Sequence, residues 1–168
     1  MIKLNIEQYL IKLLILLITF VICFEVVLSK PKLDITSTQS LHFGTFCLIG
    51  TSGGTITVGY DGNRTCTGGV VLLSNLPHCQ PAIVEIINCK DWHLVILYDS
   101  YTNLLGSFGG WIKLDIGPTE KGGSGTRFNT DGNCDIATPI RMGGTLHIPG
   151  TAKSGIYDGY FEIKIKKE

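Results

Sequence analysis

The last part of the chain alternates between apolar and charged side chains. Apolar residues stand two positions apart, with small Gly159 among them, at Tyr157, Phe161, Ile163 and Ile165. Between them stand Asp158, Glu162, Lys164 and Lys166. Because successive side chains of a strand point to opposite faces, residues 157–166 are predicted to form one half-buried β-strand. A strand with one solvated face is typical of an antiparallel sheet.

Further strands are predicted wherever apolar residues alternate with polar ones or form short runs. They cover residues 33–36, 41–44, 55–60, 64–67, 69–73, 82–87, 92–98, 111–116 and 144–149. Asp61 and Gly62 favour a tight hairpin turn, since glycine readily adopts the positive φ that such a turn needs. Apart from residues 111–116, the pattern is least regular over residues 100–140. Many short strands separated by turns predict an all-β sandwich or barrel.

The first segment has a different pattern. Lys3 and Lys12 precede an almost unbroken apolar run over residues 13–24, which is followed by Val27-Leu28-Ser29. This order predicts a signal peptide, residues 1–29, cleaved after Ser29 and followed by one domain, residues 30–168. A retained anchor is the weaker alternative, because the run is short for a membrane span and Glu25 interrupts it. We therefore expect an exported protein in the periplasm, on the cell surface or in the medium, with no membrane span in the mature chain.

The charges balance. The chain has 14 basic and 14 acidic side chains, and cleavage after Ser29 would remove two of each. A neutral domain argues against nucleic acid as a partner, since phosphate binding needs a basic surface.

Five of the six cysteines follow Ser29. In an oxidising compartment two disulfides and one free thiol are the simplest expectation, although connectivity cannot be deduced from sequence. Cys79 and Cys89 flank one predicted strand and are the first candidate pair.

Two blocks of residues resemble a known family. The first block contains Phe43-Gly44, Gly54, Arg64 and Gly69, and the second contains Gly155, Tyr157, Gly159 and Phe161. Both resemble the bacterial exported family described as domain of unknown function 4402, which is distantly similar to spore coat U and fimbrial subunit domains. The resemblance implies a single immunoglobulin-like, pilin-like antiparallel β-sandwich in the cell envelope, with no established activity.

The residues of these blocks also have a local interpretation. The glycines fall at strand ends, turns or inward positions that leave no room for a Cβ. The planar guanidinium of Arg64 is suited to hold backbone carbonyls or an acid, and an exposed charge beside the hairpin turn is the alternative.

Asn129, Asp131, Asn133 and Asp135 place oxygen-bearing side chains at every second position, as in a calcium-binding loop. The glycine and the bidentate glutamate of an EF-hand are missing, since Ile136 and Met142 stand at those positions. Asp131, Asn133 and Asp135 are therefore a weak calcium candidate, and a surface turn with Asx hydrogen bonds is the alternative. No cofactor is expected.

Exposed aromatic rings can stack on sugars, which makes glycan binding a candidate function. Trp92 and Tyr98 lie in or beside the most apolar predicted strand, so core packing is the better interpretation for both. Tyr101 and Trp111 are the other rings considered, and Trp111, which follows Phe108-Gly109-Gly110, is the preferred candidate for a glycan site. For catalysis, Ser124, His147 and Asp135 can be selected as a triad, but no elbow motif surrounds the serine, so no enzyme is expected.

We therefore expect a structural or adhesive envelope protein. One version is a pilin-like subunit that assembles with itself or other envelope subunits by strand pairing, using the alternating segment 33–36. The alternative for that segment is pairing within its own chain. The other version is a monomeric exported module that binds a ligand such as glycan.

Overall fold

The computed structural model describes Tyr9 and residues 12–18, 33–74, 77–90 and 92–168. The chain divides into two units, residues 1–31 and residues 32–168. In the first unit, Tyr9 and residues 12–18 are helical and exposed. None of the helical residues in the described ranges belongs to a helix long and apolar enough to cross a membrane. The predicted cleavage site after Ser29 lies outside the described residues.

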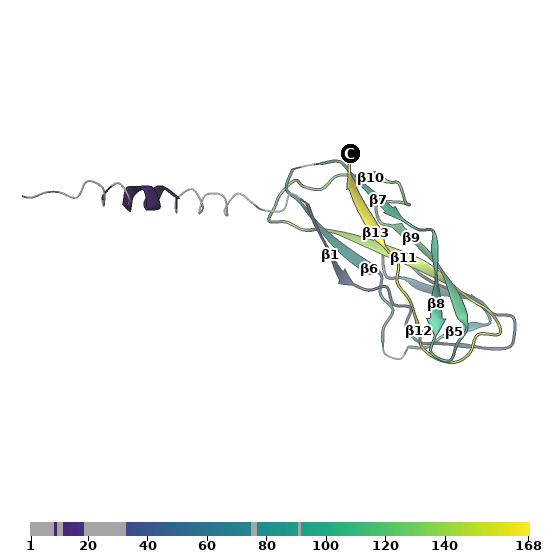
Figure 1. Cartoon of the computed structure of the whole chain (residues 1–168). Helices are drawn as coiled ribbons and strands as arrows, with labels where there is room; N and C mark the ends of the chain where they lie inside the picture. Colours follow the sequence, from purple (N-terminus) through teal and green to yellow (C-terminus); the bar gives the residue numbers. More distant parts are fainter. Residues whose placement is uncertain (1–8, 10–11, 19–32, 75–76, 91) are drawn as a thin grey trace, which may run out of the picture. The chain divides into compact units, whose positions relative to one another are not determined.

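The second unit is built around a large antiparallel sheet (Figure 1). Its main path runs in the order β1 (Leu33–Gln39), β6 (Ala82–Asn88), β11 (Thr138–Ile148), β9 (Trp111–Thr119), β8 (Tyr101–Gly106) and β12 (Tyr157–Asp158). The long strand β11 pairs with β9 along one side. Along its other side it pairs first with β6 and then with β3 (Gly54–Val58). Strand β3 in turn pairs with β4 (Arg64–Gly68).

Two smaller antiparallel sheets complete the fold. One has the order β10 (Arg127–Phe128), β7 (Leu94–Tyr98), β13 (Ile163–Lys167), and the other pairs β2 (Phe46–Leu48) with β5 (Val70–Leu72). The most apolar predicted strand, β7, is central in its sheet. The prediction of an all-β antiparallel sandwich is confirmed.

The core contains side chains from both the large sheet and the sheet centred on β7. On β6 alternate residues are buried, and Ile86 is completely inaccessible. Leu94 and Ile96 of β7 belong to the same buried cluster. Alternation of side chains along each strand thus directs one set inward and leaves the opposite face of the large sheet available to solvent.

The prediction of one continuous strand over residues 157–166 is wrong. Tyr157 and Asp158 pair with β8 in the large sheet, whereas Ile163–Lys167 pair with β7 in the small sheet. The chain therefore passes from one sheet to the other between the two pairings. Alternation alone does not reveal such a crossing, because both pieces keep the same period of two.

Residues 100–140 also contain more regular structure than their pattern indicates. Strand β8 was not predicted, β9 continues to Thr119, and β11 begins at Thr138. In β8 the outward residues Tyr101 and Leu105 are apolar although exposed, which hides the alternation. Residues 41–44 form no strand; in that segment His42 makes an isolated bridge with Gln80.

The candidate pair Cys79–Cys89 is wrong. Cys89 forms a disulfide with Cys134, 45 residues later in the chain, with Cα atoms 4.5 Å apart. Cys79 and Cys89 lie beyond opposite ends of the seven-residue strand β6, which spans roughly 23 Å. Cys134 precedes β11, whose first residues pair with the end of β6 next to Cys89.

The expectation of two disulfides is also wrong for the described cysteines. Cys47, Cys66 and Cys79 are free thiols, and only Cys47 among them is exposed. The Sγ atom of Cys66 lies 3.3 Å from the carbonyl oxygen of Val70.

Candidate functional site

The outer face of the large sheet carries an exposed tryptophan. Trp111 is the first residue of β9 and is 62% exposed, directly opposite Leu105 of β8. Tyr101, at the start of β8, is also exposed. In contrast, Trp92 and Tyr98 are half-buried and pack against the core, as predicted. Trp111 is therefore the tryptophan whose ring is available to a ligand.

A shallow, open groove with a volume of about 480 Å³ lies beside Trp111. It is lined by Gly54, Asn103, Trp111, Lys113, His147, Ile148 and Pro149. The lining combines an aromatic ring with amide, ammonium and imidazole groups. Such a mixture offers both apolar contact and hydrogen bonds, which are the two requirements of a site for a polar ligand with apolar faces.

Three charged or titratable side chains at the groove form a connected group. The Nζ atom of Lys113 lies 2.7 Å from one oxygen of Asp115, and Nε2 of His147 lies 2.6 Å from the other. The hydrogen bond from Lys113 is the largest cause lowering the pKa of Asp115 below its ordinary value of 3.8. Partial burial raises this pKa, while the hydrogen bond and the charge of His147 lower it further. Asp115 is consequently ionised and holds both neighbours in place.

Lys113 also contacts an aromatic ring. Its Nζ atom lies 5.1 Å from the ring centroid of Tyr101, within cation–π range. The ammonium is thus held between a carboxylate and a ring while remaining about half exposed. It is available as a hydrogen-bond donor without adding an uncompensated charge to the groove.

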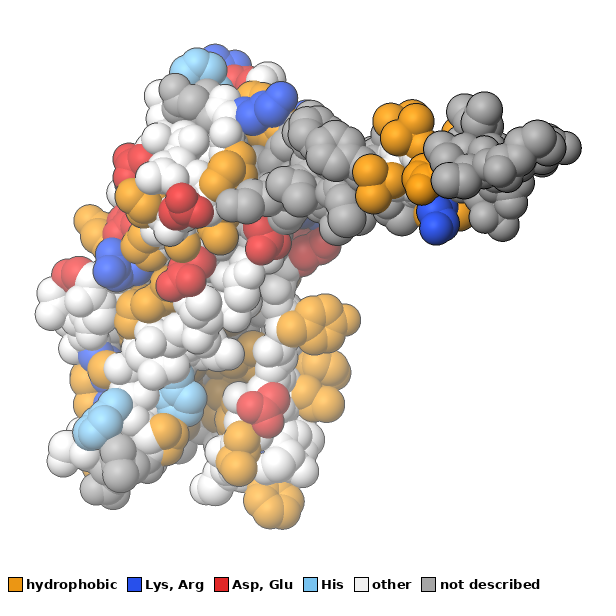
Figure 2. Space-filling model, turned by 90° about the vertical axis from the view of Figure 1, so that its left-hand side faces the viewer, with side chains coloured by type: hydrophobic (Ala, Val, Ile, Leu, Met, Phe, Trp, Pro, Cys, Tyr) orange, Lys and Arg blue, Asp and Glu red, His pale blue; other side chains and the backbone are white. Residues whose placement is uncertain are grey.

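Hydrophobic side chains continue from Trp111 toward the end of the β8–β9 hairpin. Leu105, Phe108 and Ile156 are all more than half exposed. Ser107 joins two segments here, because its amide donates to the carbonyl of Ile156 and its Oγ accepts from the Ile156 amide. Figure 2 shows the face of the molecule on the β1 side, where hydrophobic side chains lie among polar ones and several of them stand in its lower half.

The residues of the first family block hold together the segments around β2 and β5. Arg64 donates through Nη2 to the carbonyl of Thr45 at 2.7 Å and through Nη1 to that of Leu73 at 3.1 Å. Its guanidinium therefore joins the segments flanking β2 and β5. Phe43 is buried in the core, and Gly44 adopts a positive φ of 69° beside Arg64.

The glycines of this block approach other backbone segments closely. A Cβ on Gly54 would collide with the carbonyl oxygen of Thr67, and one on Gly69 would lie 2.5 Å from that of Ile49. These glycines allow β3, β4 and the segment before β5 to pack tightly.

The second block positions the crossing between the two sheets. A Cβ on Gly159 would lie 2.6 Å from Cδ2 of Leu104, so a larger residue there would require the Leu104 side chain to shift. Tyr157 and Phe161, on either side, pack against the core. The hydroxyl of Tyr157 donates to the carbonyl of Lys153 at 2.8 Å, and Gly155 has a positive φ of 151°.

The calcium candidate forms a turn with local hydrogen bonds. The side-chain oxygen of Asn133 accepts from the amide of Asp135 at 2.9 Å, and that of Asn129 lies 2.6 Å from Nδ1 of His93. Asp131 is exposed in the same segment. Within the described ranges no group of three or more His, Cys, Asp or Glu side chains is placed to hold a metal ion.

The selected triad is not assembled. The hydroxyl of Ser124 donates to the carbonyl of Tyr98 and accepts from its amide, in the small sheet. His147 instead pairs with Asp115 on the large sheet.

Sequence reasoning found Trp111 but missed Asn103, Lys113 and His147 as its neighbours. Asn103 lies opposite Lys113, and Lys113 lies opposite His147, in two successive strand pairings. The strand pattern around residue 113 and around residue 147 indicated outward side chains. The pairing of β9 with β11 was needed to bring them together.

These features define an antiparallel β-sandwich with an aromatic and polar groove on its solvated sheet face. The model of the family "Domain of unknown function (DUF4402)" matches residues 33–166, so the chain belongs to this family. No curated protein and no solved structure shows a significant match to the chain.

Proposed function

We propose that this protein is an exported adhesive domain of the bacterial cell envelope that binds glycan in the groove beside Trp111. The observation that supports this proposal is a large exposed ring next to several hydrogen-bonding side chains. Sugars present apolar faces and hydroxyl-rich edges, so one ring and a few polar groups satisfy both. The balanced charge of the Lys113–Asp115 pair suits a neutral ligand.

The proposal assigns the domain a binding role without catalysis. The imidazole of His147 and the carboxylate of Asp115 hold each other, and the Ser124 hydroxyl is bonded to the backbone of Tyr98. Export is supported by the apolar run over residues 13–24 and the disulfide between Cys89 and Cys134.

The test is binding of the purified protein, expressed as the full chain, to an array of immobilised bacterial and host glycans. We expect a subset of glycans to bind, and Trp111→Ala to weaken that binding by at least about tenfold. Trp111→Phe, which keeps a ring, should retain part of the affinity. Tyr60→Ala is the matched control, because Tyr60 is an exposed aromatic in the β3–β4 turn outside the groove. An array without any bound glycan, or equal binding by Trp111→Ala, would refute the proposal.

A second proposal is assembly of copies by strand pairing, as in a pilin-like subunit. The specific observation is β1, an edge strand in which five of seven residues are exposed. It pairs with β6 of its own chain from Leu33↔Asn88 to Gln39↔Ile83. Because few of its side chains are buried, backbone hydrogen bonds provide most of its attachment, and the same bonds are available from the β1 of another copy.

An unboiled denaturing gel of the envelope fraction tests assembly, since strand-paired polymers resist detergent until they are heated. We expect a ladder that collapses to one band on boiling, and its loss in a variant lacking residues 30–37. A single monomer band in both lanes, or an unchanged ladder in the truncated variant, would rule out this second proposal and leave glycan binding unaffected.

A further inference from the structure

The groove beside Trp111 runs across the strands. Its lining comes from four neighbouring strands. Asn103 lies on β8, Trp111 and Lys113 on β9, and Gly54 on β3, while residues 147–149 lie at the end of β11 and directly after it. A groove parallel to the strands would instead be lined by successive outward residues of one or two strands. Its orientation therefore favours a ligand that is extended perpendicular to the strands.

The strand register prolongs this line of polar groups beyond the groove. Cross-strand pairs join Asn103 to Lys113, Lys113 to His147, His147 to Thr55 and Thr55 to Thr67. Directly paired residues of antiparallel strands lie on the same face of the sheet. The row thus crosses β8, β9, β11, β3 and β4, and four strand spacings of about 4.8 Å give it a length of roughly 19 Å.

The far end of the row consists of threonines. Oγ1 of Thr55 lies 2.7 Å from Oγ1 of Thr67, and Thr57 and Thr145, also paired across the sheet, have their hydroxyls 3.0 Å apart. A hydroxyl has one donor and two acceptor positions, so each threonine keeps hydrogen-bonding capacity after its mutual bond. This end of the row, Thr55 and Thr67, offers hydroxyls in a regular arrangement and carries no charged side chain.

We propose that the glycan is an extended, β-linked chain of about four sugar units that crosses the strands. One unit stacks on Trp111, the next contacts Lys113 and His147, and the following units contact Thr55 and Thr67. Trp111 and Lys113 both lie on β9, so the first step of the chain runs from the ring to the row of paired residues. From His147 onward, a sugar unit advances by a distance close to one strand spacing of about 4.8 Å, so that successive units meet β11, β3 and β4. This inference rests on the proposed glycan binding, and it names the form of the glycan.

The first test is the dependence of affinity on chain length. Titration calorimetry would use linear oligomers of increasing length, of β-1,4-linked glucose, N-acetylglucosamine and mannose. In at least one series we expect affinity to rise by roughly tenfold from the dimer to the tetramer and to change little beyond it. Equal affinity for dimer and tetramer would overturn the inference. Binding to array glycans but to none of these linear series would also overturn it, while the proposed function would stand. Absence of binding to any glycan would refute both.

The second test removes the threonine hydroxyls. Thr55 and Thr67 hydrogen-bond each other, so the double variant Thr55→Val/Thr67→Val removes both hydroxyls together and leaves no unpaired hydroxyl behind. Valine also keeps the shape of both side chains. We expect this variant to bind the dimer as the unsubstituted protein does, and to lose the roughly tenfold gain of the tetramer. Trp111→Ala should weaken binding at every length.

The matched control is Thr36→Val, on the exposed strand β1. It should bind dimer and tetramer unchanged. Thermal unfolding of the double-valine variant would establish that the sheet is intact. Tetramer binding by a folded double-valine variant at full affinity would show that the chain does not cross β3 and β4, and would overturn the inference.

Discussion

Removing the Cys89–Cys134 disulfide is expected to destabilise the domain strongly. The bond closes a loop over a sequence separation of 45 residues, for which the loop-entropy relation predicts a loss of about 4 kcal/mol in the free energy of unfolding. The expected loss arises in the unfolded chain, which becomes free to sample conformations that the cross-link forbids. For a domain of this size the melting temperature should fall by roughly 14 °C.

The measurement is urea unfolding of Cys89→Ser/Cys134→Ser beside the unsubstituted protein, with the midpoint converted by the slope of each curve. The exposed Cys47→Ser is the matched control and should stay within about 0.5 kcal/mol of the unsubstituted protein. Peptide mapping without reduction should recover Cys89 and Cys134 in one linked fragment. A loss of less than about 1 kcal/mol in the free energy of unfolding of the double variant, or a linked fragment containing Cys79, would refute the reasoning.

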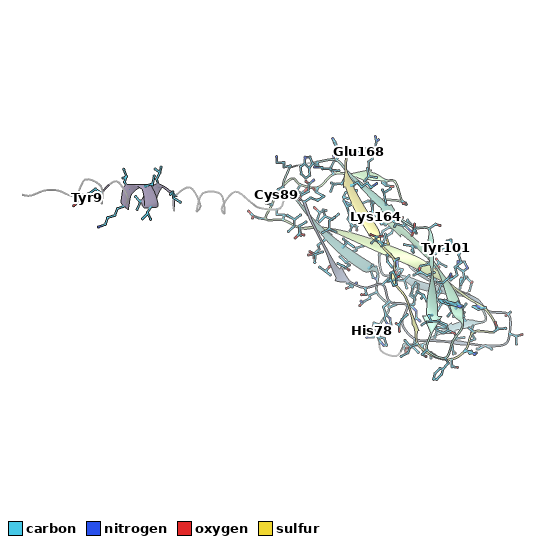
Figure 3. All side chains as sticks on the ribbon, viewed as in Figure 1. Tyr9, His78, Cys89, Tyr101, Lys164 and Glu168 are labelled. Atoms are coloured by element: carbon cyan, nitrogen blue, oxygen red, sulfur yellow. A yellow bond between two sulfur atoms is a disulfide. The ribbon has the colours of Figure 1, made fainter. Side chains whose placement is uncertain are left out.

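The disulfide and the candidate site are separate. Figure 3 places Cys89 and Tyr101 on opposite sides of the sandwich. Substituting the disulfide should therefore leave glycan affinity unchanged at temperatures where the variant is folded.

Three further predictions concern the fold and the charges of the groove. Arg64→Lys should lower stability by about 2 kcal/mol in urea, because a lysine cannot reach both carbonyls that the guanidinium holds; an unchanged midpoint would contradict this role. Gly54→Ala should lower stability by roughly 2–3 kcal/mol because its Cβ collides with a carbonyl of β4, whereas Gly123→Ala, with open space at the Cβ position, should be neutral. Because the pKa of Asp115 is lowered in the folded state, its carboxylate stabilises the fold above pH 3.8, and this contribution is lost as the pH falls through the folded-state pKa. The difference in stability between the unsubstituted protein and Asp115→Asn should therefore shrink in acid. A difference that grows in acid would show that the carboxylate does not stabilise the fold in this way.

The candidate site shows how much of a binding surface the local sequence pattern can predict. The alternation around Trp111 predicted a strand and left its ring as the preferred candidate for sugar stacking, and both the strand and the exposure agree with the structure. The rest of the groove depends on residues distant in sequence. His147 follows Asp115 by 32 positions, and they meet because β11 pairs with β9.

The division of residues 157–166 between two sheets could not be predicted from the sequence pattern either. The period of two along residues 157–166 is the same in β12 and β13, although these strands belong to different sheets. Gly159 lies close to Leu104 where the chain crosses between the sheets, and only the packed structure contains that contact.

By itself, the sequence determined the all-β class, most of the strands with clear alternation, the Asp61–Gly62 hairpin turn and the family. These features depend on side chains close together in the chain, where alternation and the conformational freedom of glycine act directly. Only the tertiary structure decided which cysteine bonds to Cys89 and which side chains surround Trp111. Both depend on strand pairing over long sequence separations, and that pairing is selected by the joint packing of the whole core.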